Sequence, residues 1–234
     1  MCPKWFEILN IGSNVKIYIL SIPFILPKTR ALRRIGPHNY DVLSILIGSL
    51  LGDAYAERHG HGTRFCFQQE HLNNPYLLWF HNYLSELGYC TTTIPILTTR
   101  LGKGGKLRYI SRFKTYTFTS FNWIHTSFYK DGKKVIPIDI GDYLSPLALA
   151  VWIMDDGGKV SSGLKLSTNS FSKSEVDYLS TLLINKYGFK VSVISAGKIN
   201  QYNLYVSKNS MKKLSQIIKP YLHPSMYYKL NGYI

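Results

Sequence analysis

Two short segments about a hundred residues apart read alike, and this repetition constrains the fold more than any other feature of the chain. One is Leu46-Ile-Gly-Ser-Leu-Leu-Gly-Asp-Ala54 and the other is Leu149-Ala-Val-Trp-Ile-Met-Asp-Asp-Gly157. Each is an apolar run of helical length that ends in an aspartate followed by Ala or Gly. Two copies of one supersecondary unit predict a pseudo-symmetric molecule.

The sequence around each segment predicts, in outline, the same order of elements. In the first half a helix, a strand, a helix, two strands and a helix are expected at 40–52, 64–69, 74–87, 91–97, 107–120 and 121–129. In the second half the matching elements are expected at 145–156, 164–168, 172–187, 190–194, 202–207 and 210–219. The expected fold class is α/β (mixed α+β), a pseudo-twofold duplicated αββαββα with two antiparallel sheets. We expect the halves to span 38–137 and 138–234, after an N-terminal arm at 1–37.

Local signals predict where several helices begin and end. Ser145 and Ser172 are expected to be N-cap residues, the second of them in a capping box with Glu175. Gly188 is expected to stop the preceding helix, and Gly157 to supply a left-handed cap.

The composition describes a globular protein with an excess of positive charge. Of 234 residues, 45% are apolar, 28 are Lys or Arg and 13 are Asp or Glu, a formal net charge of +15. A polyanion relieves such self-repulsion, so nucleic acid or an anionic membrane is the first partner to consider, with an ordinary basic protein as the simpler alternative. Three scattered cysteines argue against a disulfide framework or a zinc site. The apolar stretch at 17–26 is shorter than the roughly 20 residues that a membrane-spanning helix needs, so it is expected to pack within the arm.

The aspartates at the ends of the two segments are candidates for chemistry. A carboxylate at a helix C-terminus faces the negative end of the helix dipole, which a cation would compensate. If the two helices pack side by side through small residues, Asp53 and Asp156 meet at one end of the contact. Two carboxylates and backbone carbonyls suit Mg²⁺, which keeps waters for an attack on a phosphodiester. The alternative is that these are only polar helix ends. The expected small contact residues are Gly48, Gly52, Ala148 and Ala150.

These residues carry a family resemblance over about residues 40 to 230. The chain resembles the single-chain (two-motif) LAGLIDADG homing endonucleases of the type encoded in mitochondrial group I introns. The resemblance is strongest in Leu144-Ser-Pro-Leu-Ala-Leu-Ala-Val-Trp-Ile-Met-Asp-Asp-Gly-Gly-Lys159, in Lys134-Val-Ile-Pro137, and in the segment at 219–230. It departs from the usual pattern at Gly52, where Ala or an acid is common, and at Val151, where Gly is common.

The resemblance implies roles for individual residues. Asp53 and Asp156 would bind divalent metal, Mg²⁺ with Mn²⁺ as a substitute, and the carbonyls of Gly52 and Asp155 would add ligands. Lys134 and Lys229 would lie in the active-site pocket, where a cation near the attacked phosphate stabilises developing charge or positions water.

The strands alternate basic or polar residues with apolar ones, which is typical of a sheet with one face on helices and the other towards DNA. A solvated outer face is the alternative. The candidate DNA contacts are Arg64, Gln68, Glu70, Arg100, Lys103, Lys106, Arg108, Arg112, Lys114, Lys165, Asn169, Lys190 and Lys198.

The expected function is a monomeric, site-specific double-strand DNA endonuclease. By the resemblance, it would bind a long duplex site across its two sheets, leave short 3′ overhangs, act in intron homing and work in the mitochondrion, without a membrane partner. The leading alternative is an RNA maturase that binds its own group I intron and assists splicing. A DNA-binding regulator with an inactive site is a third interpretation. Both aspartates and both lysines are present, which favours the nuclease, because RNA binding alone does not require them.

Overall fold

The computed structural model describes residues 8–10, 16–18, 29–230 and 232–233. Within the arm, β1 (Ile8–Asn10) and β2 (Lys16–Tyr18) pair as antiparallel strands, and a 3-10 turn, η1, covers Ala31–Arg33. Most of the stretch at 17–26, which was expected to pack within the arm, lies outside the described residues.

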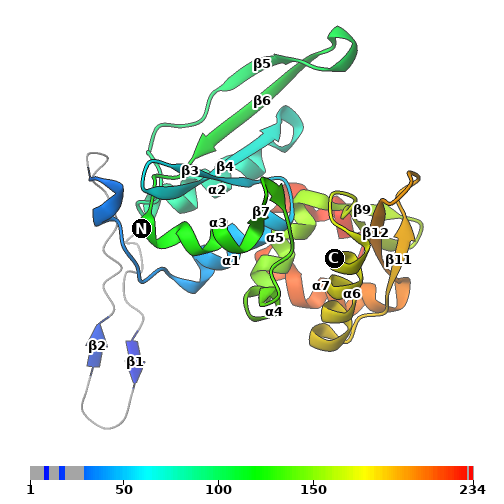
Figure 1. Cartoon of the computed structure of the whole chain (residues 1–234). Coiled ribbons are helices and arrows are strands. Elements are labelled where there is room, and N and C mark those ends of the chain that lie inside the picture. Colours follow the sequence, from blue (N-terminus) through cyan, green and yellow to red (C-terminus); the bar gives the residue numbers. More distant parts are fainter. Residues whose placement is uncertain (1–7, 11–15, 19–28, 231, 234) are drawn as a thin grey trace.

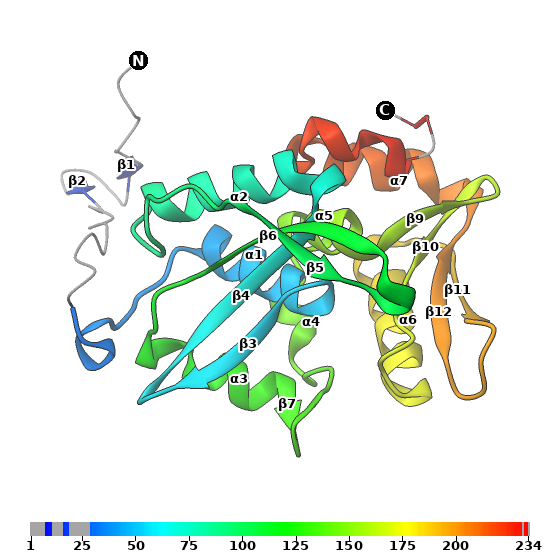
Figure 2. The same cartoon turned by 90° about the horizontal axis from the view of Figure 1, so that it is seen from above.

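The rest of the chain forms two halves of the same topology (Figures 1 and 2). The first half has the order α1 (Tyr40–Leu51), β3 (Tyr55–His59), β4 (Gly62–Glu70), α2 (Asn74–Glu86), β5 (Leu97–Leu101), β6 (Leu107–Lys114) and α3 (Asn122–Phe128). The second has the order α5 (Pro146–Asp156), β9 (Gly157–Val160), β10 (Gly163–Leu166), α6 (Lys173–Tyr187), β11 (Val191–Ser195), β12 (Tyr202–Val206) and α7 (Lys208–Ile218). The short elements are β7 (Tyr129–Lys130), β8 (Lys133–Lys134), α4 (Ile140–Tyr143), η2 (His71–Asn73), η3 (Lys103–Gly105), η4 (Thr119–Phe121), η5 (Lys219–Tyr221) and η6 (Pro224–Leu230).

Both sheets are antiparallel and have equivalent strand orders, β3-β4-β6-β5 and β9-β10-β12-β11. The duplicated αββαββα fold predicted from the sequence is therefore confirmed. One face of each sheet packs on helices and contributes to a shared core, and the other face is open. The α1–α5 pair lies between the two sheets (Figures 1 and 2).

The two motif helices pack directly on each other through small residues. Gly48 and Ala148 meet so closely that a Cβ built on Gly48 would overlap the backbone of Ala148. At the other end of the contact, the hydroxyl of Ser145 donates to the hydroxyl of Ser44 at 2.8 Å. Most residues of both helices are buried, because each helix contacts its partner on one side and a sheet on another.

Most of the predicted caps are confirmed, and one is wrong. The Ser145 side chain accepts from the Ala148 amide, Ser172 and Glu175 form the capping box, and Gly188 adopts a left-handed conformation with φ of 63°. Gly157 instead has φ −71° and ψ 143° and begins strand β9. Glycine is needed there because a Cβ would overlap the carbonyl oxygen of Ile153.

Three strand predictions in the first half need correction. The segment 91–96 is not a strand, and the strand that follows is Leu97–Leu101. Pro95 cannot donate to a ladder, and the tight turn before Leu107 aligns Leu101 with Leu107. Strand β6 ends at Lys114 rather than near Ser120, and β3, directly after the first motif, was not anticipated from the sequence.

Replacing Gly48 by alanine tests the close helix contact. We expect Gly48→Ala to lower the free energy of unfolding, measured by urea denaturation, by about 1–3 kcal/mol because of overpacking. Alanine is the better helix former by about 1 kcal/mol, so a gain in stability would contradict this packing. Gly158→Ala is the matched control, because no atom lies within 4 Å of a Cβ built there.

Candidate active site between the motif helices

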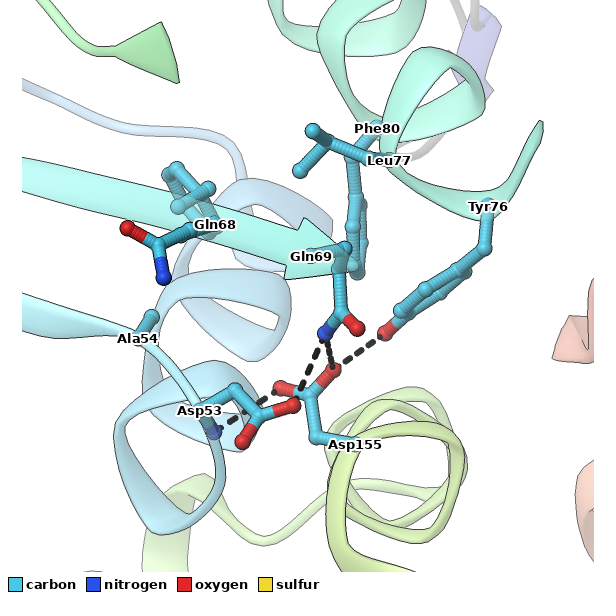
Figure 3. A pocket seen from close by; sticks show the side chains of 9 residues that line it. Asp53, Ala54, Gln68, Gln69, Tyr76, Leu77, Phe80 and Asp155 are labelled. Atoms are coloured by element: carbon cyan, nitrogen blue, oxygen red, sulfur yellow. Dashed lines mark hydrogen bonds between the residues drawn. The ribbon is translucent and has the colours of Figure 1, made fainter. Parts of the chain in front are cut away.

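The acidic ends of the two motifs meet at one place in the structure. Asp53 directly follows the C-cap residue of α1, and Asp156 is the last residue of α5. The backbone amide of Asp53 reaches across the contact to the carboxylate of Asp155, with an N–O distance of 3.4 Å. Figure 3 shows the Asp53 and Asp155 side chains lying against each other at the ends of the two helices. The aspartates therefore form one composite acidic site.

Asp155 has a larger part in this site than its backbone carbonyl alone. Its side chain occupies the space beside Gly52, where a Cβ would lie 2.5 Å from the Cβ of Asp155. The glycine that departs from the usual family pattern therefore makes room for an acidic side chain from the other half. Asp155 also accepts a hydrogen bond from the hydroxyl of Tyr76, a buried α2 residue, at 2.9 Å.

Gln69 connects the acidic residues to the first sheet. Its amide nitrogen donates to Asp53 at 2.8 Å and to Asp155 at 3.4 Å, and its oxygen accepts from Asn73 at 3.1 Å. The amide orientation is thus fixed by partners on both sides; Figure 3 shows the bonds from Gln69 to the two aspartates. Sequence reasoning missed Gln69 and Tyr76. The available signal was alternation: Gln68 and Glu70 face outwards on β4, so Gln69 must point to the helices.

Each expected active-site lysine reaches the C-terminal end of the motif helix in its own half. Lys134 donates to the carbonyl oxygens of Ala54 at 2.8 Å and Gly52 at 3.3 Å. Lys229 donates to the carbonyl oxygens of Met154 and Asp155, the latter at 3.0 Å. A cation is favourable at the negative end of a helix. The two carbonyls that the resemblance implies as metal ligands thus already accept from lysine, and each retains a second lone pair.

Burial and like charge shape the ionisation of this site. Burial raises the pKa of Asp156 to about 7, and the Asp53 carboxylate adds to the rise. Burial, again with a contribution from Asp53, raises the pKa of Asp155 well above its usual value. Burial lowers the pKa of Lys134 and Lys229, and the nearby aspartates oppose that change. The carboxylates are therefore crowded enough that a bound cation would stabilise their charged forms.

The outer face of the first sheet gathers most of the expected DNA contacts. Gln68 pairs with Arg112 and Arg100 pairs with Arg108 in the strand register, and strand alternation places the others on the same face. The opposite face carries the buried Phe65, Phe67 and Phe113 of the core. The residues brought together are Arg64, Gln68, Glu70, Arg100, Arg108, Arg112 and Lys114.

Two carboxylates on this outer face hold three of the basic side chains. Glu57, a β3 residue that sequence reasoning did not select, pairs with Arg64 and with Lys114, the latter at 2.9 Å. The hydrogen bond from Lys114, together with Arg64, lowers the pKa of Glu57 to about 2. Glu70 pairs with Arg108 at 2.7 Å. This face is therefore an ordered set of ion pairs as well as a basic surface.

The remaining candidates are spread over the turns and the second sheet. Lys106 is exposed at the β5–β6 turn, and the side chain of Lys103 lies outside the described parts of that turn. Lys165 lies on β10 opposite Tyr205, on the outer face, and exposed Lys190 directly precedes β11. Asn169 follows β10 and Lys198 lies in the β11–β12 connection, both exposed and away from the strand registers.

Two further findings concern the described residues only. No group of three or more His, Cys, Asp or Glu side chains there is arranged as a metal cluster, so a metal at the aspartates would need other oxygen ligands. Among the same residues, no helix combines the length and apolarity required to traverse a bilayer.

Comparison with known proteins places this geometry in a family. The model of the LAGLIDADG DNA endonuclease family matches residues 43–214. The cytochrome b mRNA maturase bI2 of Saccharomyces cerevisiae is 49% identical over 86% of this chain, and the protein of the same name from Debaryomyces hansenii is 50% identical over 85%. The chain spans 49% and 76% of the lengths of these two relatives, respectively. The intron-encoded endonuclease ai4 of Dictyostelium discoideum is 41% identical over 64% of this chain and 97% of its own length.

A solved structure agrees with the fold. The homing endonuclease I-WcaI bound to its DNA recognition sequence has a TM-score of 0.75 and 23% identity, with 88% of this chain and 94% of that chain covered. Because the family model spans most of the duplicated region, the chain belongs to the LAGLIDADG DNA endonuclease family.

Proposed function

We propose that this protein is a site-specific endonuclease that cuts both strands of a long DNA duplex and leaves short 3′ overhangs, as intron homing requires. The observation that carries the proposal is the meeting of Asp53 and the Asp155–Asp156 pair at the helix contact, with one lysine from each half beside it, half-buried Lys134 and buried Lys229. Two sheets with basic residues on their outer faces flank this centre. Each half would act on one strand.

The donor set fits a hard divalent cation such as Mg²⁺. Asp53 and Asp156 offer carboxylate oxygens, and the carbonyls of Gly52 and Asp155 lie at the same helix ends. Mg²⁺ usually binds through one or two carboxylates and retains water, so it does not require three His, Cys, Asp or Glu side chains arranged around one ion, an arrangement not found among the described residues. Solved structures of I-DmoI with its target DNA include one obtained in the presence of Mn, at a TM-score of 0.50. We propose Mg²⁺ as the ion, with Mn²⁺ as a substitute.

When bound, such a metal would activate water and stabilise the leaving oxygen. The chain's own residues would orient the metal-binding carboxylate and neutralise charge on the attacked phosphate. Gln69 holds the Asp53 carboxylate in one orientation by donating to it at 2.8 Å. Lys134 and Lys229 bring positive charge to the two helix ends, where they would stabilise the negative charge that develops on the attacked phosphate.

The ion pairs of the first sheet separate the basic side chains that would contact bases from those that would contact phosphates. A carboxylate is repelled by phosphate, so Glu57 and Glu70 belong at base edges in the major groove rather than at the DNA backbone. They would orient Arg64, Lys114 and Arg108 towards bases. Basic side chains outside these pairs, at Arg100, Arg112 and the turn residue Lys106, would contact phosphates.

A second candidate function is supported by the relatives. The two proteins that are 49% and 50% identical to this chain are named as maturases of cytochrome b mRNA. We propose that this chain also binds its own intron RNA and assists splicing. These names also support an organelle origin, and we propose mitochondrial action. Because one chain contains both half-sites, a monomer is sufficient.

Cleavage of an intronless host-gene allele tests the nuclease directly. We expect cutting of both strands with Mg²⁺ and none with EDTA. Asp53→Asn and Asp156→Asn should each reduce double-strand cleavage by about 10³-fold or more while DNA binding, measured in Ca²⁺, stays within a few fold, because electrostatic stabilisation of the transition state is lost. Asp177→Asn, a change at an exposed ion pair with Lys173, is the control. Unchanged cleavage in either motif variant would contradict the metal assignment.

The raised pKa of Asp156 predicts a stability effect that does not depend on activity. The folded protein holds this proton up to about pH 7, whereas the unfolded chain loses it near pH 4. Ionisation of Asp156 therefore lowers the stability of the metal-free protein as pH rises between these values, and the full effect is present above pH 7. In EDTA, Asp156→Asn should raise the free energy of unfolding by on the order of 2 kcal/mol at pH 8, with a smaller gain at pH 5.

Excess Mg²⁺ should instead make the wild-type protein more stable than Asp156→Asn. It should stabilise the wild-type protein by binding the folded state, and have little effect on Asp156→Asn. Equal responses of the two proteins to Mg²⁺ would show that Asp156 does not bind the ion.

Glu57→Gln tests the division of labour on the first sheet. Removing this carboxylate should tighten binding to non-specific duplex several-fold, because one repulsive charge is lost, and should lower the ratio of specific to non-specific affinity. Asp177→Asn changes the net charge equally but lies on α6, so its specificity ratio should be unaltered. Binding titrations at several salt concentrations measure both ratios. A specificity ratio that is unchanged in Glu57→Gln would exclude an orienting role for Glu57.

A further inference from the structure

The C-terminal quarter of the chain contains no acidic residue. Asp177 is the last carboxylate side chain in the sequence, and the following 57 residues include eight lysines. One of them, Lys229, belongs to the candidate active site. Helix α7 and the residue that follows it contribute four of the others: Lys208, Lys212, Lys213 and Lys219.

Three of these lysines form a stripe on one side of α7. Lys208, Lys212 and Lys219 have spacings that place them within about 40° of one another around a helix axis, over a length of about 16 Å. Lys219 keeps helical backbone angles, with φ −51° and ψ −41°. All three are exposed, whereas Met211, Leu214 and Ile218 on the other side of the helix are buried. We call Lys208, Lys212 and Lys219 the lysine stripe.

Among the described residues, no carboxylate forms an ion pair with the lysine stripe. In the part of the chain that the structure describes, the ion pairs involve Glu57, Glu70 and Asp177, and none of them includes a lysine of the stripe. The sequence contains no acid within thirty residues before Lys208 or anywhere after it. Three like charges on one helix face repel one another, and an external polyanion relieves that repulsion.

An exposed aromatic side chain follows the stripe closely in the sequence. Tyr221 follows Lys219 by two residues in η5 and has 39% of its surface exposed. Aromatic rings beside basic side chains stack on unpaired bases, which is a common way to bind single-stranded regions of RNA.

The stripe lies away from the proposed DNA-binding faces. Its helix packs its buried side on α5 and β10, so the stripe is separated from the outer face of the second sheet by the helix and the sheet itself. In Figure 1, α7 lies on the side of the α1–α5 pair opposite the β5–β6 ribbon. A duplex held on the outer faces of the sheets would not reach it.

We propose that the lysine stripe and Tyr221 form a binding surface for structured RNA with unpaired bases, separate from the DNA site. This inference rests on the proposed maturase function and assigns it a location. RNA is the partner because the sheets already provide the duplex surface, the exposed tyrosine suits unpaired bases, and the relatives that are about half identical to this chain are named mRNA maturases.

The test is a triple variant of the full chain, Lys208→Gln, Lys212→Gln and Lys219→Gln, titrated against a transcript of its own intron with bulk tRNA as competitor. We expect the dissociation constant for the transcript to rise at least tenfold and the slope of log affinity against log salt to fall by about two to three. DNA cleavage by the same preparation should stay within twofold of wild type, which also reports that the variant is folded. Tyr221→Ala should weaken RNA binding several-fold and Tyr221→Phe should restore it, because a phenylalanine ring still stacks.

A matched variant removes three exposed lysines elsewhere: Lys130→Gln, Lys133→Gln and Lys186→Gln. Its RNA affinity should fall by less than threefold. Equal losses of RNA affinity in the two triple variants would mean that the stripe acts only through the overall charge of the protein, and would overturn the proposal. If the wild-type protein binds the transcript but the stripe variant binds it equally well, the location is wrong while the maturase function stands. If the wild-type protein does not bind the transcript, the maturase function and the proposed RNA-binding surface are both wrong.

Discussion

The contact between α1 and α5 is the constraint on which the rest of the structure depends. Gly48 lets the two backbones touch at Ala148, and Gly52 leaves room for the side chain of Asp155. Because the helices approach this closely, their C-terminal ends are adjacent, and Asp53 and Asp156 come from opposite halves to one centre. A wider separation would leave two distant polar helix ends with no shared site. The same two helices also carry much of the core, so packing and active-site geometry are set by the same residues.

The site is pseudo-symmetric in its backbone and asymmetric in its side chains. Each half supplies one aspartate and one lysine that reaches the end of its own motif helix. Only the first half adds Gln69 and Tyr76, which bind the carboxylates from β4 and α2. Glycine in the first motif and aspartate in the second are therefore complementary, since one fills the space that the other leaves. The departure at Gly52 from the family pattern has this steric reason.

Charge is arranged in three different ways across the molecule. At the helix contact, burial and the nearby Asp53 carboxylate raise the pKa of Asp155 and Asp156, and two lysines only partly compensate these shifts. On the first sheet, glutamates hold basic side chains in ion pairs, which gives order at the expense of net positive charge. On α7 the lysines have no such partners in the described part of the chain. These arrangements suit a metal, base edges and a flexible polyanion respectively, because they differ in how strongly each position is fixed.

The sequence by itself determined the duplicated fold, most of the helix caps and the expectation that the two motif ends meet, because these follow from local periodicity and from repetition. It placed Asp53, Asp156, Lys134 and Lys229 through the family resemblance, and the tertiary structure decided what they touch. Gln69, Tyr76 and Glu57 could not be found in advance, because their partners are distant in sequence and only the sheet register brings them together. The first-half strands shifted for the same reason: pairing with β6 and the turn at 102–106 set the register, whereas β-branched composition alone favoured 91–97. Local chemistry therefore fixed which elements form, and long-range packing fixed how their side chains meet.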